Sequence, residues 1–125
     1  MGKKTPPWPD YPKWTTARFW AFVRSNLRRA HGHWPPFREA KLEGRKNKPA
    51  ETPGRHKYEH QCEHCQEWFP EKMIEMDHRV PVGTLTKHDD LPGFVMRLYA
   101  PASEYRKLCI PCHQAVTNEE RQGKT

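Results

Sequence analysis

The stretch LCIPCHQAVTN, Leu108 to Asn118, carries the pattern on which the predicted fold depends. Its Cys-x-x-Cys turn repeats the spacing of CEHC at residues 62–65, and the two turns contain all four cysteines of the chain. Each turn presents two thiolates from a tight loop, and four thiolates complete the tetrahedral shell of a structural zinc ion. The sequence therefore predicts one zinc site, made by Cys62, Cys65, Cys109 and Cys112.

Two other uses of the cysteines stay open. Disulfide bonds are one, although the lack of a secretory signal and the polar composition favour a metal. A redox pair of the thioredoxin type is the other, although it needs a strand–helix setting that CEHC lacks. Histidines flank the first pair, but four cysteines already fill the site. We therefore expect the histidines without a motif at the surface: His31, His33, His56, His60, His64 and His88.

The composition indicates why a metal is needed. Of 125 residues, 34% are hydrophobic and 13 are prolines, and the mean hydropathy is -1.09. Such a chain buries little apolar surface for its length, so the binding energy of zinc would become folding energy. No apolar run approaches the roughly 20 residues of a membrane helix, and MGKKTPPWPD lacks the apolar core of a signal peptide. We expect a soluble protein in the cytoplasm, with no membrane partner.

The charge is unevenly spread along the chain. Residues 1–57 contain 14 lysines and arginines against four acids, a balance of +10, and residues 58–125 contain eight against 11, a balance of -3, which together give the net charge of +7. A basic segment of this kind is typical of proteins that bind nucleic acid through its phosphates. A solvated basic tail without a specific partner is the alternative.

Apolar periodicity predicts two helices in the basic segment. Residues 15–30, TTARFWAFVRSNLRRA, place apolar side chains at steps of three and four behind a threonine cap. A second short basic helix is expected in residues 37–46, FREAKLEGRK, while residues 1–13, with four prolines, are expected to be extended or disordered. The cations expected to contact the DNA backbone are Arg18, Arg24, Arg28, Arg29, Lys41, Arg45 and Lys46.

From Tyr58 onward the pattern indicates short strands and helices around the cysteines. KMIEMDHRVPV, residues 72–82, is typical of a strand ended by Pro81. A short helix is expected to begin near Pro92, a second strand in EYRKLC at residues 104–109, and a last helix near Pro111. This order predicts an α+β domain in residues 58–125, with residues 1–57 as a basic, partly helical N-terminal extension.

Asp77 and His78 are the candidates for chemistry in the first strand. His113 directly follows Cys112, so the second zinc turn would fix it at the start of the last helix, near these two residues. Because neighbouring strand residues point to opposite faces, Asp77 and His78 cannot both reach one metal comfortably. Two separate tasks fit better, with one residue binding a metal ion and the other handling a proton.

The order of these motifs resembles that of a known family. A first cysteine pair, then DHRVP, then LCIPCHQAVTN resembles the zinc-ribboned branch of the HNH endonucleases, the ββα-metal nucleases, over about residues 58–120. The run from HDDLPGF to the second cysteine pair is similar to small HNH proteins of tailed bacteriophages. The resemblance implies a ββα-metal, treble-clef-like core stapled by the four-cysteine zinc site.

The same resemblance implies roles for single residues. His78 would be the general base, while Asp77 and His113 would hold one Mg²⁺ or Mn²⁺ ion against the scissile phosphate. Glu104 stands where the family has an Asn that orients the base, and it can serve the base, approach the metal or do neither. Val116 replaces a Lys that is frequent in the family, which removes one phosphate contact.

The implied activity is metal-dependent hydrolysis of DNA phosphodiester bonds, by nicking or by double-strand cutting. It would serve phage DNA processing or packaging in the host cytoplasm, with a packaging or replication protein as a partner. The alternative is a non-catalytic, zinc-containing DNA-binding or regulatory protein with a degenerate HNH fold. A third option is a subunit that cuts only together with its partner protein.

Overall fold

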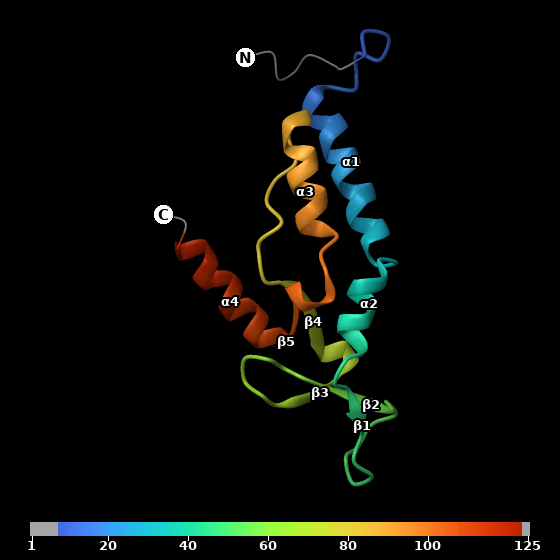
Figure 1. Ribbon diagram of the computed structural model, residues 1–125, viewed down its shortest axis with the longest axis vertical. Helices are drawn as coiled ribbons and strands as arrows, with labels where there is room; N and C mark the ends of the chain where they lie inside the picture. Colours follow the sequence, from blue (N-terminus) through green and yellow to red (C-terminus); the bar gives the residue numbers. More distant parts are fainter. Residues whose placement is uncertain (1–7, 124–125) are drawn as a thin grey trace. The chain divides into compact units, whose positions relative to one another are not determined.

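The computed structural model describes residues 8–123 (Figure 1). Helices and antiparallel strands are mixed, so the fold class is α+β, as predicted. The chain forms two compact units: one combines residues up to Arg38 with Val80–Pro101, and the other combines Glu39–Arg79 with the chain from Ala102 onward. These units divide the chain at other places than the predicted boundary after Lys57, because the segment between the two central strands packs with the N-terminal helices.

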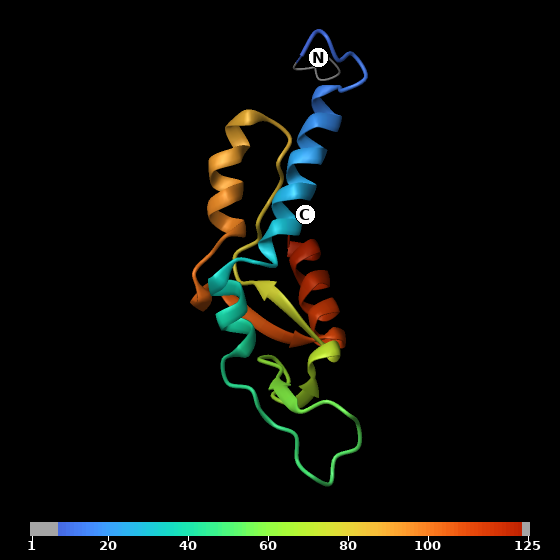
Figure 2. The ribbon, with the colours of Figure 1, turned by 90° about the vertical axis from the view of Figure 1, so that its right-hand side faces the viewer.

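The first unit is built on two helices, α1 (Thr16–His31) and α3 (Leu91–Leu98). They lie side by side in both ribbon views (Figures 1 and 2). The predicted first helix is confirmed, and Thr15 caps it by accepting a hydrogen bond from the Arg18 N–H at 3.2 Å. Val23 and Leu27 of the predicted apolar face, together with the flanking Trp20, pack on a buried cluster of Val82, Leu85, Phe94 and Leu98.

Hydrogen bonds from aromatic side chains fasten the ends of these helices. Tyr99 Oη donates to the Leu27 carbonyl at 2.6 Å, and Trp34 Nε1 donates to the Ala100 carbonyl at 2.7 Å. The expectation that His31 lies at the surface is wrong. Its side chain is buried, with its ring centroid 5.7 Å from that of Tyr99, because α1 ends where this aromatic group closes the unit.

The second unit contains two small sheets and the last helix. β1 (Lys46–Asn47), β2 (Tyr58–Gln61) and β3 (Trp68–Pro70) form one antiparallel sheet, in that order. β4 (Ile74–His78) pairs with β5 (Tyr105–Cys109) in a register that runs from Ile74 opposite Cys109 to His78 opposite Tyr105. Both predicted strands are present and form one antiparallel pair, but the first ends at His78 and not at Pro81. Most of the chain between them belongs to the first unit.

α4 (Ile110–Gly123) begins directly after β5, which confirms the last predicted helix. It lies beside the β4–β5 pair in both ribbon views (Figures 1 and 2). Cys62, Leu108 and Cys109 form the buried core here, and Phe69, Ile74, Cys112 and Val116 pack against it. Cysteines therefore take up much of a core that has few large apolar side chains.

One further α-helix completes the set of four in the described residues. α2 (Pro35–Leu42) corresponds to the second predicted helix, although it starts and ends earlier than residues 37–46.

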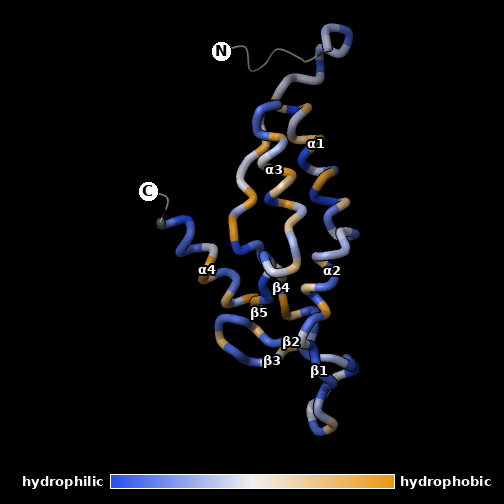
Figure 3. Tube along the Cα trace, in the orientation of Figure 1, coloured by the Kyte–Doolittle hydropathy of each residue, from blue (hydrophilic) through white to orange (hydrophobic). Residues whose placement is uncertain are grey.

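Hydrophobic residues occur in short runs along α1 and α3 (Figure 3). Among the helices of residues 8–123, none combines the length and the apolar character that crossing a membrane requires. The expectation for residues 1–13 falls partly outside the described residues.

Candidate functional site

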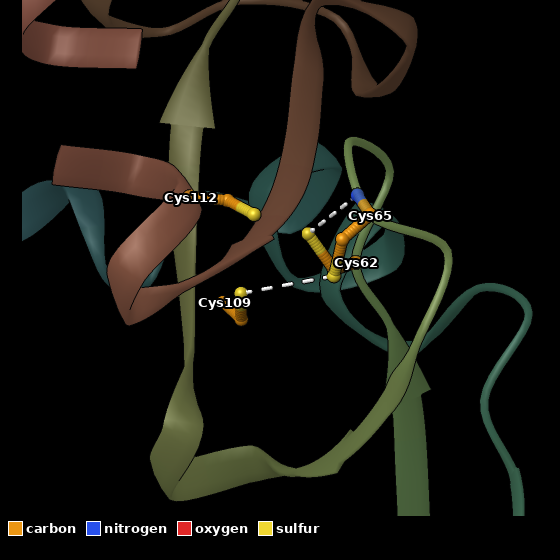
Figure 4. Close-up of side chains that lie close together, drawn as sticks. All are labelled: Cys62, Cys65, Cys109 and Cys112. Atoms are coloured by element: carbon orange, nitrogen blue, oxygen red, sulfur yellow. Dashed lines mark hydrogen bonds between the residues drawn. The ribbon is translucent and has the colours of Figure 1, made fainter. Parts of the chain in front are cut away.

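The four cysteines converge in the second unit (Figure 4). Cys62 and Cys65 come from the loop between β2 and β3, Cys109 ends β5, and Cys112 lies in the first turn of α4. All four sulfur atoms lie within 4.8 Å of one another, and the Sγ atoms of Cys65 and Cys109 are 3.9 Å apart. Sulfurs around a tetrahedral zinc ion, each about 2.3 Å from it, lie about 3.8 Å apart. The cysteines are therefore positioned to hold a metal ion, and their spacing fits zinc.

The electrostatics of these sulfurs favour a cation between them. Burial raises the pKa of the Cys62 thiol, but hydrogen bonds from the backbone N–H groups of Cys65, Cys109 and His64 outweigh burial and lower that pKa to about 6. Hydrogen bonding with Cys109, followed by burial, raises the pKa of Cys112 to about 12. Neighbouring thiolates repel one another, so they ionise together only beside a positive charge. A divalent ion supplies that charge and lets all four sulfurs bind as thiolates.

The cysteine cluster also sets the position of α4. It connects the β2–β3 loop to the junction of β5 and α4, where the Glu63 N–H donates to the Lys107 carbonyl at 2.8 Å. His113 follows Cys112 in the first turn of α4. The side chain of His113 is thereby directed toward β4.

A group of charged side chains lies where α4 meets β4 and β5. His113 Nε2 is 3.6 Å from Asp77 Oδ1, and His113 Nδ1 is 3.7 Å from Glu75 Oε2. Arg106, which is opposite Asp77 across the strand pair, donates from Nε to Asp77 Oδ2 at 2.8 Å. Arg106 Nη2 also lies 3.7 Å from Glu120 Oε2. The structure thus brings Asp77 and His113 together and adds Glu75, Arg106 and Glu120, which sequence reasoning missed.

The donor atoms of Asp77 and His113 suit a hard divalent ion. A carboxylate and an imidazole are ligands that Mn²⁺ and related ions accept, with positions left for water and substrate. Two neighbouring ligands of an octahedral ion, each about 2.1 Å away from it, lie about 3.0 Å apart. The 3.6 Å between Asp77 Oδ1 and His113 Nε2 needs only a small closing movement to reach that spacing.

His78 occupies the other face of β4. It ends the strand opposite Tyr105, and the two ring centroids are 4.9 Å apart. Because side chains alternate along a strand, His78 and Asp77 leave β4 on opposite faces. The strand pairing therefore brings Asp77, and not His78, toward His113.

Glu104 directly precedes Tyr105, the residue that pairs with His78. Its backbone carbonyl accepts a hydrogen bond from the Arg79 N–H at 2.8 Å. Two hydrogen bonds to Glu63, at 2.6 and 2.7 Å, are the main cause of a raised pKa of Arg79, and the charge of Glu104 adds to it. Arg79 and Glu63 border a cavity of about 660 Å³ in the second unit. The charge of Glu104 therefore acts on Arg79, a residue that the sequence had not singled out.

A partly buried lysine that lines this cavity was also missed. Lys107 Nζ donates to the carbonyls of Lys41 at 3.1 Å and Glu43 at 2.6 Å, and lies 3.2 Å from His60 Nδ1. The expectation that His60 lies at the surface is wrong, because its side chain is buried beside Lys107. Burial lowers the pKa of both groups. The sequence signal that could have revealed the role of Lys107 is the C-terminal end of α2, because the free carbonyls of a helix end attract a cation.

The cations expected to bind DNA are divided between the two units. Arg18, Arg24, Arg28 and Arg29 are exposed on α1 in the first unit. In the second unit, Lys41 pairs with Glu71 at 2.8 Å, and cationic groups lie over aromatic rings in two pairs, Arg45 with Tyr58 and Lys46 with Trp68. These residues therefore belong to two units rather than to one continuous extension.

The chain was compared with models of protein families, with curated proteins and with solved structures, and no match was found. The second unit nevertheless offers two distinct groups of side chains on which a function can be built. One is the cluster of four sulfurs, and the other is the carboxylate–imidazole pair of Asp77 and His113.

Proposed function

We propose that the protein is a metal-dependent DNA endonuclease of the HNH type. The observation that carries the proposal is the 3.6 Å approach of His113 Nε2, from the first turn of α4, to Asp77 Oδ1 on β4. The cysteine cluster next to His113 holds this helix start in place. Two antiparallel strands followed by a helix, with one candidate ligand from β4 and one from α4, agree with the sequence resemblance to ββα-metal nucleases.

Asp77 and His113 would hold one Mg²⁺ or Mn²⁺ ion. Such an ion stabilises negative charge on the phosphoryl oxygens and on the departing 3′ oxygen. Arg106 binds Oδ2 of Asp77, which leaves Oδ1 directed toward His113. A phosphate reaching the site would also meet the guanidinium of Arg106 as a source of positive charge.

His78 would take the proton from the attacking water, because an unprotonated imidazole nitrogen is a proton acceptor. Its ring lies against Tyr105, which restricts its rotation. β4 is an edge strand of a two-stranded sheet, so its open edge borders both faces. The scissile phosphate would lie along that edge, within reach of Asp77 from one face and of His78 from the other. Hydrolysis would leave a 5′ phosphate and a 3′ hydroxyl.

The exposed arginines of α1 would supply sequence-independent contacts to DNA phosphates. The net charge of +7 favours association with DNA, since each contacted phosphate releases counterions. Affinity should fall steeply as salt rises, by a slope of about -0.9 in log units for each neutralised phosphate. Packaging or other processing of phage DNA, with a phage protein as partner, is the biological role that we propose.

Cleavage of supercoiled plasmid tests the proposal. Wild type is expected to nick or cut in Mg²⁺ or Mn²⁺ and to stop when EDTA is added. His78→Ala should lower the rate by about 10²- to 10⁴-fold, as expected for loss of a general base. His88→Ala is the matched control, because His88 is an exposed histidine of the first unit, and it should cut like wild type. Cleavage by His78→Ala at the wild-type rate would exclude His78 as the base.

The 2.8 Å bond between Arg106 and Asp77 favours a second candidate function, a non-catalytic DNA-binding protein. In that protein Arg106 would neutralise Asp77 permanently and leave His113 without a carboxylate partner for binding a metal ion. The two candidates differ in the same assay. A protein that retards DNA in a gel but never cuts it in Mg²⁺, Mn²⁺, Ni²⁺ or Zn²⁺ is the binder. Weak cutting that rises sharply with a partner protein would indicate a nuclease subunit.

A further inference from the structure

We propose that Glu75 is a positioning residue that fixes the tautomer of His113, and so prepares Nε2 of that histidine for a metal ion. The inference rests on the metal site of the proposed function and adds a residue to it. Glu75 and Asp77 are two positions apart on β4, so their side chains share one face of the strand. His113 reaches that face from the first turn of α4 and contacts both carboxylates.

The two contacts involve different nitrogens of one ring. Glu75 Oε2 lies 3.7 Å from Nδ1, and Asp77 Oδ1 lies 3.6 Å from Nε2. These nitrogens are on different sides of the imidazole, so the ring stands between the two carboxylates. Glu75 therefore lies beside Nδ1 and Asp77 beside Nε2, so the two carboxylates take different roles in this arrangement. Within residues 8–123, the four cysteines are the one set of three or more histidine, cysteine, aspartate or glutamate side chains whose ligand atoms all lie within 4.8 Å of one another. Glu75, Asp77 and His113 do not form such a three-ligand set.

The two tautomers of a neutral imidazole differ in which ring nitrogen can bind a metal ion. One ring nitrogen carries the proton, and the other has the lone pair that binds a metal. A carboxylate near Nδ1 favours the tautomer with the proton on Nδ1, which leaves the lone pair of Nε2 directed toward Asp77. The opposite tautomer would donate from Nε2 to Asp77 and block the ion. Carboxylates hold metal-binding histidines in this way in many proteins.

Repulsion between neighbouring carboxylates makes a glutamate at position 75 unfavourable unless it has a role in the site. Glu75, Asp77 and Glu120 bring three carboxylates to the same region, and Arg106 contacts two of them, Asp77 and Glu120. Glutamate is also a poor strand former. The Glu75 side chain is 48% exposed, so it can move the short distance from 3.7 Å to a hydrogen bond with Nδ1. A divalent ion beside Nε2 would offset the repulsion among the carboxylates.

Two measurements on the zinc-loaded full chain test the role of Glu75. Mn²⁺ affinity is measured by EPR, and long-range ¹H–¹⁵N NMR reports which nitrogen of His113 carries the proton. Glu75→Ala should weaken Mn²⁺ binding by about 10- to 100-fold and shift the proton of His113 toward Nε2. Glu75→Gln keeps an acceptor oxygen and should restore most of both properties. Glu119→Ala, an exposed glutamate on α4, should match wild type.

The outcomes separate this inference from the proposed function. Wild-type Mn²⁺ affinity and an unchanged tautomer in Glu75→Ala would overturn the role of Glu75 and leave the nuclease proposal intact. A loss of affinity in Glu75→Ala without a tautomer change would make Glu75 a ligand, which also overturns the positioning role. If wild type binds no Mn²⁺, the metal site of the proposed function fails, while the NMR spectra still decide whether Glu75 selects the tautomer. Zinc content and circular dichroism show that each variant is folded.

Discussion

Arg106 holds Asp77 by one short hydrogen bond, and both side chains are mostly buried, at 21% and 19% exposed. Arg106→Met keeps the aliphatic stem but leaves Asp77 beside Glu75 without a compensating cation. We expect the free energy of unfolding to fall by about 1.5 to 3 kcal/mol, the range for a hydrogen bond to a charged group. The loss should shrink in Mn²⁺, because the bound ion replaces the missing positive charge.

Urea unfolding with and without Mn²⁺ measures both effects. Arg121→Met, at an exposed arginine of α4, is the control and should change stability little in either condition. If the loss in Arg106→Met is the same with and without Mn²⁺, the ion does not bind next to Asp77.

The sequence predicts some residues of this site better than others. The cysteine cluster and the place of His113 at the start of the last helix follow from spacing, whereas the metal-binding role of His113 is what the family resemblance implies. Arg106 and Glu75 could not be found in this way. Their contacts depend on the register between β4 and β5, and a shift by one residue would turn every side chain to the other face. The separation of His78 from Asp77 follows from the same alternation.

At the scale of single elements, the C-terminal end of helix α2 is stabilised by a lysine from strand β5. Lys107 on β5 donates to the carbonyls of Lys41 and Glu43 at the end of α2, where the helix leaves its last carbonyls free. Lys107→Met should lower the free energy of unfolding by about 1 to 3 kcal/mol, because it leaves half-buried carbonyls without a donor. Urea unfolding gives the value, and Lys72→Met, at an exposed lysine, is the matched control. Equal stability of the two variants would mean that water satisfies these carbonyls.

A carboxylate closes the turn that precedes α3. The backbone N–H of Thr86 donates to Asp90 Oδ2 at 3.0 Å and holds the pKa of Asp90 below its ordinary value of 3.8. Because the folded pKa is the lower one, the contribution to stability is present above pH 3.8 and is lost as the pH falls through the folded pKa. Asp90→Asn should speed hydrogen exchange at the Thr86 amide at neutral pH, where wild type is protected.

NMR gives the exchange rates, and a carboxyl titration of wild type should show the Asp90 midpoint below pH 3.8. Asp89→Asn, at the exposed neighbouring residue, should leave exchange at Thr86 unchanged. A midpoint at or above the ordinary value would show that Thr86 does not donate to Asp90.

Most helices and strands were predictable because each one carries its own periodicity or cap. The helix from Thr16 to His31 and the last helix from Ile110 follow from spacing and from the cysteine turn. The small sheet of β1, β2 and β3 was less predictable, since β1 has two residues and its pairing depends on a distant strand. Short strands show too few alternations to reveal a period.

At the scale of the whole chain, the division into units could not be predicted from charge. The basic balance of residues 1–57 suggested a boundary after Lys57, but the first unit also takes in Val80–Pro101. The apolar residues of that segment, Val82, Leu85, Phe94 and Leu98, form the buried core on which α1 packs. A domain made of two separated segments depends on contacts distant in sequence, which local patterns do not encode.

Removal of the metal should therefore affect the two units differently. In the second unit, the buried cluster at the cysteine site consists of Leu108 and two cysteines, whereas four apolar side chains and no cysteine form the buried cluster of the first. Because the binding energy of a structural ion is folding energy, a strong zinc chelator should remove hydrogen-exchange protection from β4, β5 and the start of α4. Protection in α1 and α3 should persist in part.

Hydrogen exchange followed by mass spectrometry resolves these segments, and Cys65→Ser should reproduce the effect of the chelator without any added reagent. Chelator already saturated with zinc is the control and should change nothing. Full protection of β4 and β5 after the metal is stripped would show that the cysteine cluster does not support the fold. Simultaneous loss of protection in α1 and α3 would show that the first unit, whose two segments are joined by Glu39–Arg79 with β4 near its end, cannot keep its helices once β4 and β5 separate.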